Sequence, residues 1–132
     1  MAIGWVCLVS DDPPMFLVGI DDQAYTLELI RRNREFVIAY PSTEMAKETL
    51  YVGTTHGHNE DKGTKSGLKF SPPSKGNVPI LADAVANFEC RLVTEYRPGN
   101  CPLIVGEVIA SHVNTDESIR RLVNFGKGYQ LR

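Results

Sequence analysis

The sequence predicts a single domain, residues 1–132, that is mainly β with short helices. Apolar and polar side chains alternate over residues 86–93, which is the spacing of a half-buried strand. A turn sequence, R-P-G-N at residues 97–100, separates this segment from an apolar run at residues 103–113, and the two segments therefore predict an antiparallel hairpin. Because the strand-like segments outnumber the short helical ones, we expect an antiparallel sheet or barrel with peripheral helices.

The composition is that of a globular protein. Hydrophobic residues make up 42% of the 132 residues and charged residues 23%. The net charge of −2 argues against nucleic acid or an anionic membrane as a partner, and the apolar runs are too short to cross a bilayer. We see no secretion signal and expect a cytoplasmic protein.

The cysteines and histidines do not predict a metal centre. Cys7, Cys90 and Cys101 lie far apart with no C-x-x-C pair, which indicates reduced thiols. His56 and His58 form an H-G-H pair without a nearby third and fourth ligand. We therefore predict no metal site.

The first half of the chain alternates between strands and short helices. Residues 3–10 and 15–20 are β-prone, and we expect Pro13 and Pro14 to lie between these strands because proline cannot donate a ladder hydrogen bond. A helix is predicted from Tyr25, with Thr26 as a plausible N-cap, and it is followed by a strand at 35–40. A second helix is predicted over residues 41–52, with Gly53 just beyond its end.

Residues 54–76 are predicted to form a long surface loop. Gly, Thr, Ser, Lys and Pro dominate this segment, and only Leu68 and Phe70 offer apolar anchors. Loops of this length without structure of their own are usually functional or mobile.

Six short motifs are spread over almost the whole chain: residues 1–5 (M-A-I-G-W), residues 9–14 (V-S-D-D-P-P), residues 25–30 (Y-T-L-E-L-I), Asp61-Lys62, residues 87–90 (N-F-E-C) and residues 106–108 (G-E-V). In the same order, they resemble the segments M-T-x-x-W, V-S-x-x-P-P, Y-T-x-E-L-I, D-K, x-x-E-C and G-E-V of the flavin-reductase-like FMN-binding split-barrel family. No single motif is specific, but six in register form a strong signal.

The resemblance implies a Greek-key split barrel that forms a homodimer, with FMN bound near the interface. NADH or NADPH would bind transiently, a redox partner protein is conceivable, and no catalytic side chain is implied. Carried over by position, the implied cofactor-binding residues are Ala2, Trp5, Cys7, Gln23, Thr26 and Lys62.

The chemistry of FMN asks for some of these residue types independently. A phosphate of about −1.5 to −2 charge favours a cation and the N–H groups at a helix N-terminus. Lys62 supplies a cation, and Thr26 supplies a hydroxyl at the start of a helix. The structural alternatives stay open: Thr26 as a helix cap alone, Lys62 as a surface charge, Trp5 as core or dimer packing, and Cys7 as a small buried apolar residue.

Three features depart from the family pattern. Met1 stands where family members have an internal methionine. The family's first strand, and an Asn that commonly contacts flavin, therefore have no counterpart in this sequence. Either the start is truncated or the chain is a shortened variant. The phosphate loop carries Asp21 and Asp22 and lacks the family's S-R pair, which we expect to weaken FMN binding by roughly a hundredfold. In the hairpin, Asn100 and Cys101 stand where flavoredoxins place a histidine.

Three functions are compatible with the sequence. The first is an NAD(P)H-dependent flavin reductase, and the second is a non-enzymatic FMN electron carrier of the flavoredoxin type. The third is a shortened homologue with weak or no flavin binding. The chain has no G-x-G-x-x-G following a strand, so we expect a nicotinamide cofactor to stack transiently on the flavin without a Rossmann fold.

Overall fold

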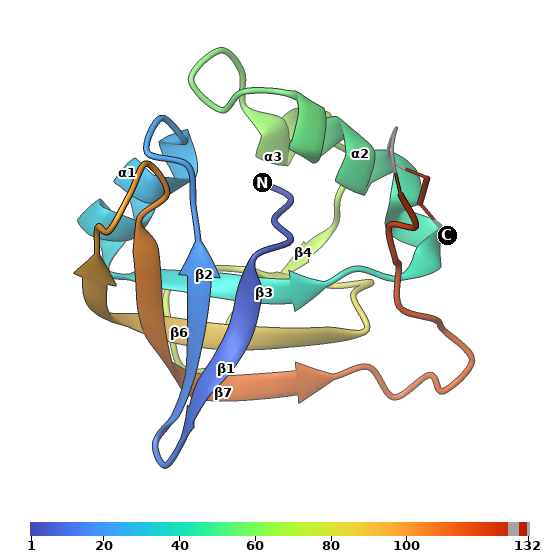
Figure 1. Ribbon diagram of the computed structural model, residues 1–132. Helices are drawn as coiled ribbons and strands as arrows, with labels where there is room; N and C mark the ends of the chain where they lie inside the picture. The colour runs from blue at the N-terminus through green and yellow to red at the C-terminus, as the bar shows by residue number, and fades with distance from the viewer. Residues whose placement is uncertain (127–129, 132) are drawn as a thin grey trace.

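A five-stranded antiparallel sheet forms the body of the computed structural model, which describes residues 1–126 and 130–131 (Figure 1). The strand order is β1-β2-β7-β6-β3, and within the described residues β1 and β3 remain the two edges of a sheet that does not close. This arrangement confirms the prediction of a mainly β fold with short helices. The strands are β1 (Val6–Asp11), β2 (Pro14–Gly19), β3 (Glu35–Tyr40), β6 (Ala86–Tyr96) and β7 (Leu103–Val113), and a separate two-stranded ribbon is formed by β4 (Phe70–Ser71) and β5 (Ile80–Leu81).

The β6–β7 hairpin is the longest pairing in the sheet, as the alternation predicted. Its register shifts between Glu89 and Cys90 and again between Leu92 and Thr94. Such irregularities break strict alternation because each one changes the face that the following side chains occupy. Asn87 and Glu89, which were expected on the polar side of the strand, are nevertheless buried, because they bind Ser74, Lys75, Gly76 and Leu81 in the segment that lies over this side of β6.

The helices lie near the predicted positions, with corrections at their ends. The first helix, α1 (Tyr25–Asn33), is N-capped by Ala24, so the interpretation of Thr26 as the cap was wrong. Its C-cap is Arg34, which has a left-handed φ of 62°. The second region divides into η1 (Thr43–Met45) and α2 (Ala46–Thr54), so that Gly53 lies inside the helix and not after it. In the described part of the chain no helix is long and apolar enough to cross a membrane.

Two other sequence expectations need correction. Pro14 is the first residue of β2 and pairs with Asp11, a position that proline tolerates because the first residue of a strand need not donate a ladder hydrogen bond. The predicted loop at 54–76 contains α3 (Lys62–Lys65) and β4. Both elements are too short to give a periodic pattern in the sequence.

The core lies between α1 and the concave side of the sheet. Leu27 and Ile30 of α1 are buried against it, and Ile104 of β7 is fully buried. The other members come from β2, β3 and β6 or their flanks: Phe16, Val18, Ile20, Phe36, Ile38, Cys90 and Leu92.

Gly106 of β7 packs closely against Phe36 and Cys90 in this core. A Cβ atom at Gly106 would lie 2.5 Å from Cζ of Phe36 and 3.1 Å from Cβ of Cys90. We expect Gly106→Ala to lower the free energy of unfolding by about 1–3 kcal/mol because the core must shift to admit the methyl group.

The matched control for this substitution is Gly99→Ala, in the hairpin turn, where a Cβ atom meets nothing within 4 Å. We expect it to change stability by less than about 0.5 kcal/mol. Urea denaturation of both variants measures the difference, and equal stabilities would contradict the packing described for β7.

Candidate functional site

A cavity of about 430 Å³ lies beneath the N-terminal segment, between α1, β3 and the helices α2 and α3. Figure 1 shows the N-terminus in this space, between β3 and α3. The floor is formed by residues 35–39 of β3, and one side by residues of α1. The opposite side is formed by the segment that carries β4 and β5, including Phe70, Val78 and Pro79. The lining is mostly apolar, as it is in many ligand sites of this size.

Lys62 places a positive charge at one end of the cavity. The residue is the first of α3, whose N-cap Asp61 accepts a hydrogen bond from the backbone N–H of Thr64. The Lys62 ammonium donates to the carbonyl oxygens of Val52 at 2.8 Å and Thr55 at 3.0 Å, at the C-terminal end of α2. Carbonyls at a helix C-terminus favour a cation, which fixes the ammonium at this position.

The positive charge of Lys62 is only partly compensated by its surroundings. Burial lowers the pKa of Lys62, and the nearby carboxylate of Glu60 raises it to a smaller extent. The environment around Lys62 therefore favours an anion.

Thr26 and Ala2 line the same cavity as Lys62. Thr26 is the second residue of α1, and the N-cap Ala24 makes no side-chain hydrogen bond to the first turn. An uncapped helix N-terminus presents backbone N–H groups and the positive end of the helix dipole. The structure thus brings together Ala2, Thr26 and Lys62, three of the six residues singled out in the sequence.

The other three residues lie outside the cavity lining. Trp5 precedes β1 and is 67% exposed, with its ring against Gly19, where an added Cβ atom would come within 3.2 Å of it. Cys7 is an exposed free thiol in β1. The backbone N–H of Gln23 donates to Oδ1 of Asp21 at 2.8 Å, in the turn before α1.

Asp21 and Asp22, in the loop before α1, repel a phosphate less than the sequence suggested. Asp22 forms an ion pair with Arg97 at 2.6 Å and has Arg31 at 3.9 Å, while Asp21 accepts the hydrogen bond from Gln23. Neither aspartate lines the cavity. The repulsion expected between these two residues and a phosphate is therefore reduced by pairing and by position.

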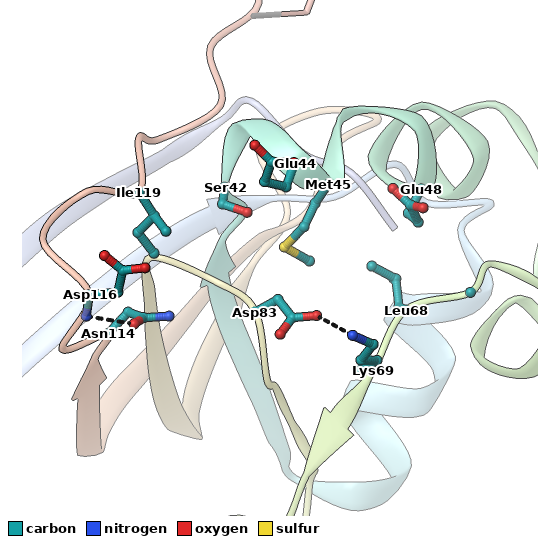
Figure 2. A pocket seen from close by; sticks show the side chains of 11 residues that line it. Ser42, Glu44, Met45, Glu48, Leu68, Lys69, Asp83, Asn114, Asp116 and Ile119 are labelled. Atoms are coloured by element: carbon teal, nitrogen blue, oxygen red, sulfur yellow. Dashed lines mark hydrogen bonds and ion pairs between the residues drawn. The ribbon is translucent and has the colours of Figure 1, made fainter.

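A second pocket, of about 470 Å³, has the opposite electrostatic character (Figure 2). It is lined by Glu44, Glu48, Asp83 and Asp116, with Lys69 paired to Asp83 at 3.4 Å. Four carboxylates and one lysine disfavour a phosphate. Of the two pockets, the one that contains Lys62 is therefore the candidate for an anionic cofactor.

His58 and His112 each contact a carboxylate. His58 Nε2 lies 2.8 Å from Glu28 on α1, and His112 Nε2 lies 2.6 Å from Glu89. Among residues 1–126 and 130–131 no group of three or more His, Cys, Asp or Glu side chains is arranged to hold a metal ion.

Sequence reasoning missed most of the apolar lining. Phe36 and Ile38 of β3 read as ordinary core residues, since a strand with one buried face has the same pattern whether that face meets a helix or a cavity. Val78 and Pro79 lie in a segment without periodicity. Only their position opposite β3 in the folded chain shows that they contribute to the site.

Comparison with known proteins identifies a domain family and several relatives that the chain resembles. The model of the "Flavin reductase like domain" family matches residues 1–131. An uncharacterized protein of Archaeoglobus fulgidus is 35% identical over 120 residues, which cover 91% of this chain and 67% of that protein. The FMN reductase (NADH) RutF of Agrobacterium fabrum is 24% identical over 127 residues, which cover 96% of this chain and 69% of that protein.

A solved structure shows the same fold. The flavoredoxin from Methanosarcina acetivorans superposes with a TM-score of 0.88 at 28% sequence identity, covering all of this chain and 75% of that one. This likeness confirms the predicted split-barrel fold. Because the family model extends over nearly the whole sequence, this chain belongs to the flavin reductase like domain family.

Proposed function

We propose that this protein binds FMN in the cavity between α1 and β3 and acts as an NAD(P)H-dependent oxidoreductase of the flavin reductase type. One observation carries the proposal: Thr26 and Lys62, which are distant in the sequence, line the same apolar cavity. Its volume of about 430 Å³ lies in the range of cofactor sites. The names of the relatives support flavin chemistry, since one is an NADH-dependent FMN reductase and another a flavoredoxin.

Lys62 is suited to bind the phosphate of FMN. An ammonium group has three N–H donors, and the carbonyls of Val52 and Thr55 use two of them. The third is left for a phosphate oxygen. The phosphate would also offset the burial that lowers the pKa of Lys62, because a nearby negative charge favours the protonated lysine.

Thr26 adds a hydroxyl group and the start of a helix. The first turn of α1 has no side-chain cap, so its backbone N–H groups can donate to an anion at this end of the cavity. Ala2, which lines the same cavity, would contact the ring system of FMN. Flavin contacts by Trp5, Cys7 and Gln23 stay a prediction, which requires the cofactor to extend past the cavity along β1.

Bound FMN would supply the hydride-accepting chemistry, and the side chains of the cavity would hold and orient it. The carboxylate of Glu35 also lines the cavity, but its Oε2 accepts a hydrogen bond from the backbone N–H of Asn77 at 2.8 Å. Glu35 is thus placed to fix a loop. The apolar walls would exclude water from the ring, which strengthens the remaining electrostatic interactions.

A non-enzymatic electron carrier is the second candidate, favoured by the likeness to a flavoredoxin. In that role the protein would exchange electrons with a redox partner protein and would not react directly with NADH or NADPH. The two functions share the cavity and its phosphate end. They differ in the source of the electrons.

We further propose that the protein is a homodimer that buries the outer side of β1, with FMN close to the interface. Trp5, Leu8 and Val9 expose large apolar side chains along this edge strand. An exposed apolar edge strand favours pairing with another chain.

Light scattering, which measures the mass of the protein in solution, tests the proposed dimer. We expect a dimer for the wild type and a monomer for Leu8→Glu. A monomeric wild type would contradict this proposal.

Replacement of Lys62 tests the phosphate site. We expect Lys62→Ala to weaken FMN binding by about tenfold or more, because a hydrogen bond to a charged group contributes about 1.5–3 kcal/mol. The matched control is Lys65→Ala on the same helix, whose ammonium is exposed and pairs with Glu60 at 3.2 Å. FMN fluorescence titration measures both affinities. Equal affinities for the two variants would contradict the assignment of Lys62 to the phosphate site.

Mixing FMN-loaded protein with NADH or NADPH without oxygen separates the two candidate functions. We expect rapid bleaching of the flavin absorbance near its visible maximum, because a nicotinamide ring can stack on a flavin held in an open cavity without a Rossmann fold. Stopped-flow absorbance measures the rate. Bleaching by dithionite but by neither nicotinamide would contradict the reductase and leave the electron carrier.

A further inference from the structure

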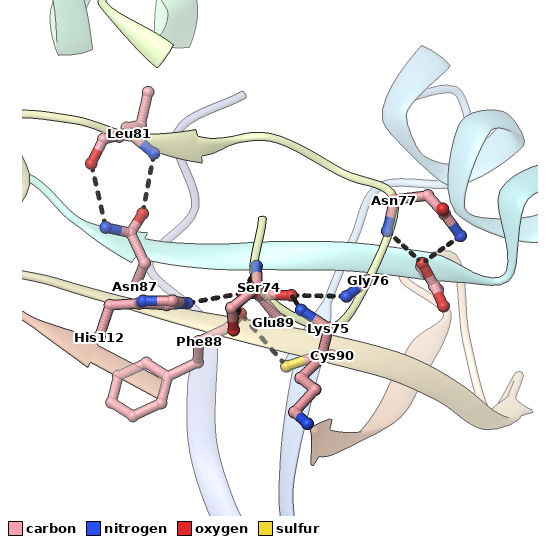
Figure 3. A network of polar contacts seen from close by, with 11 residues as sticks. Ser74, Lys75, Gly76, Asn77, Leu81, Asn87, Phe88, Glu89, Cys90 and His112 are labelled. Atoms are coloured by element: carbon pink, nitrogen blue, oxygen red, sulfur yellow. Dashed lines mark hydrogen bonds and ion pairs between the residues drawn. The ribbon is translucent and has the colours of Figure 1, made fainter. Parts of the chain in front are cut away.

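Strand β6 carries two buried polar side chains that face the segment between β4 and β5. Asn87 is 4% exposed and Glu89 is 2% exposed. The two residues are two positions apart, so both reach the same side of the strand. Figure 3 shows Glu89 extending toward Ser74, Lys75 and Gly76, and Asn87 extending toward Leu81.

Glu89 binds residues 74–76 through both carboxylate oxygens. Its Oε1 accepts from the backbone N–H of Ser74 at 2.8 Å and from the Ser74 hydroxyl at 3.1 Å. Its Oε2 accepts from the backbone N–H groups of Lys75 at 3.0 Å and Gly76 at 2.7 Å. His112 Nε2 lies 2.6 Å from Oε1.

These contacts keep the buried carboxylate ionised. Burial alone would raise the pKa of Glu89, but the hydrogen bonds from the backbone of Gly76, Ser74 and Lys75 and from His112 outweigh it and lower the pKa to about 2. Three consecutive backbone N–H groups directed at one carboxylate form an anion-binding loop, here occupied by a side chain of the protein itself.

Two further contacts fix the rest of the segment. Asn87 holds Leu81 at both backbone groups, accepting from its N–H at 2.9 Å and donating to its carbonyl at 3.0 Å. Asn77 donates its backbone N–H to Glu35 at 2.8 Å. Residues 74–81 are therefore attached to β3 and β6 near both ends, while Val78 and Pro79 between these attachments line the cavity.

Gly76 shows how closely the loop approaches the two carboxylates. A Cβ atom at this position would lie 3.1 Å from Oε2 of Glu35 and 3.4 Å from Oε2 of Glu89. A side chain at residue 76 would therefore require the Glu35 carboxylate to shift slightly and would contact the Glu89 carboxylate.

We propose that Glu89 is a positioning residue for the cofactor, holding residues 74–76 on the sheet so that Val78 and Pro79 form one wall of the flavin cavity. The inference rests on the proposed function, since it assumes that FMN occupies this cavity. Glu89 does not itself line the cavity and acts through the loop.

Glu89→Gln is the decisive variant because it keeps the size of the side chain. An amide has one acceptor oxygen, so its NH₂ group must face N–H donors that the carboxylate now satisfies. We expect the amide hydrogens of Ser74, Lys75 and Gly76 to exchange about tenfold faster or more in the protein without FMN, and the dissociation constant for FMN to rise by a similar factor.

Two controls separate positioning from loss of stability. Glu117→Gln makes the same chemical change at an exposed residue, and Ile104→Val trims a core residue that does not itself line the cavity. We expect Glu117→Gln to change neither measurement. We expect Ile104→Val to lower stability while leaving the FMN affinity and the visible spectrum of the bound flavin as in the wild type.

Gly76→Val disturbs the same contact from the loop side, and it replaces Glu89→Gln should that variant fail to fold. We expect faster exchange at residues 74–76 and weaker FMN binding. The proposal is overturned if either variant binds FMN with wild-type affinity and spectrum, or if residues 74–76 keep their protection. A wild type that takes up no FMN overturns it together with the proposed function, and the exchange data then show whether the loop attachment itself exists.

Discussion

The ammonium of Lys62, held by two carbonyl groups where α2 ends, is the interaction on which the candidate site depends. Partial burial of a lysine is costly unless its charge is compensated, and the carbonyls of Val52 and Thr55 provide part of that compensation. They also fix the position of the ammonium, and Lys62 lines the cavity. The remaining charge makes the mostly apolar cavity electropositive at Lys62.

The open sheet supplies the space beside this charge. With β1 and β3 at opposite edges, the floor of the cavity is a strand and its sides are α1 and the segment around β4 and β5. A wall made of such short elements has little stability of its own, since two-stranded pairs are marginal in water. The side chains of Glu89, Asn87 and Glu35 compensate by binding its backbone directly. The sheet therefore determines the shape of the cavity through polar contacts as well as apolar packing.

Electrostatics also distinguishes the two pockets, which share Leu68 in their linings. Asp22, which lies close in sequence to the start of α1, is neutralised by Arg97 from the β6–β7 hairpin. The second pocket contains Glu44, Glu48, Asp83 and Asp116 and is not lined by Lys62. An anion that approaches the protein would thus be favoured at the first cavity and disfavoured at the second.

The sequence predicted the regular elements better than their connections. The strands at 35–40 and 103–113 have the predicted bounds because each combines β-branched or aromatic residues with clear turn signals on both sides. The N-cap was assigned to Thr26 because threonine favours that position, but the chain places Ala24 there. Within residues 54–76, α3 and β4 are stabilised by tertiary contacts and leave no periodic signal.

The candidate site was predicted in part. Ala2, Thr26 and Lys62 were singled out from the motifs, and the fold brings them to one cavity. Glu89 and Asn87 stood within a motif but read as the solvent side of a strand, because the register shifts of β6 and the loop that covers it cannot be inferred from alternation. His112, which is 23 residues from Glu89 in the sequence, contacts it across the hairpin.

The structure of the FMN complex tests the central claim most directly. This account predicts a phosphate oxygen within hydrogen-bonding distance of the Lys62 ammonium and the Thr26 hydroxyl, with the ring between β3 and the wall formed by Val78 and Pro79. A phosphate bound at another surface, or a ring outside this cavity, would contradict it.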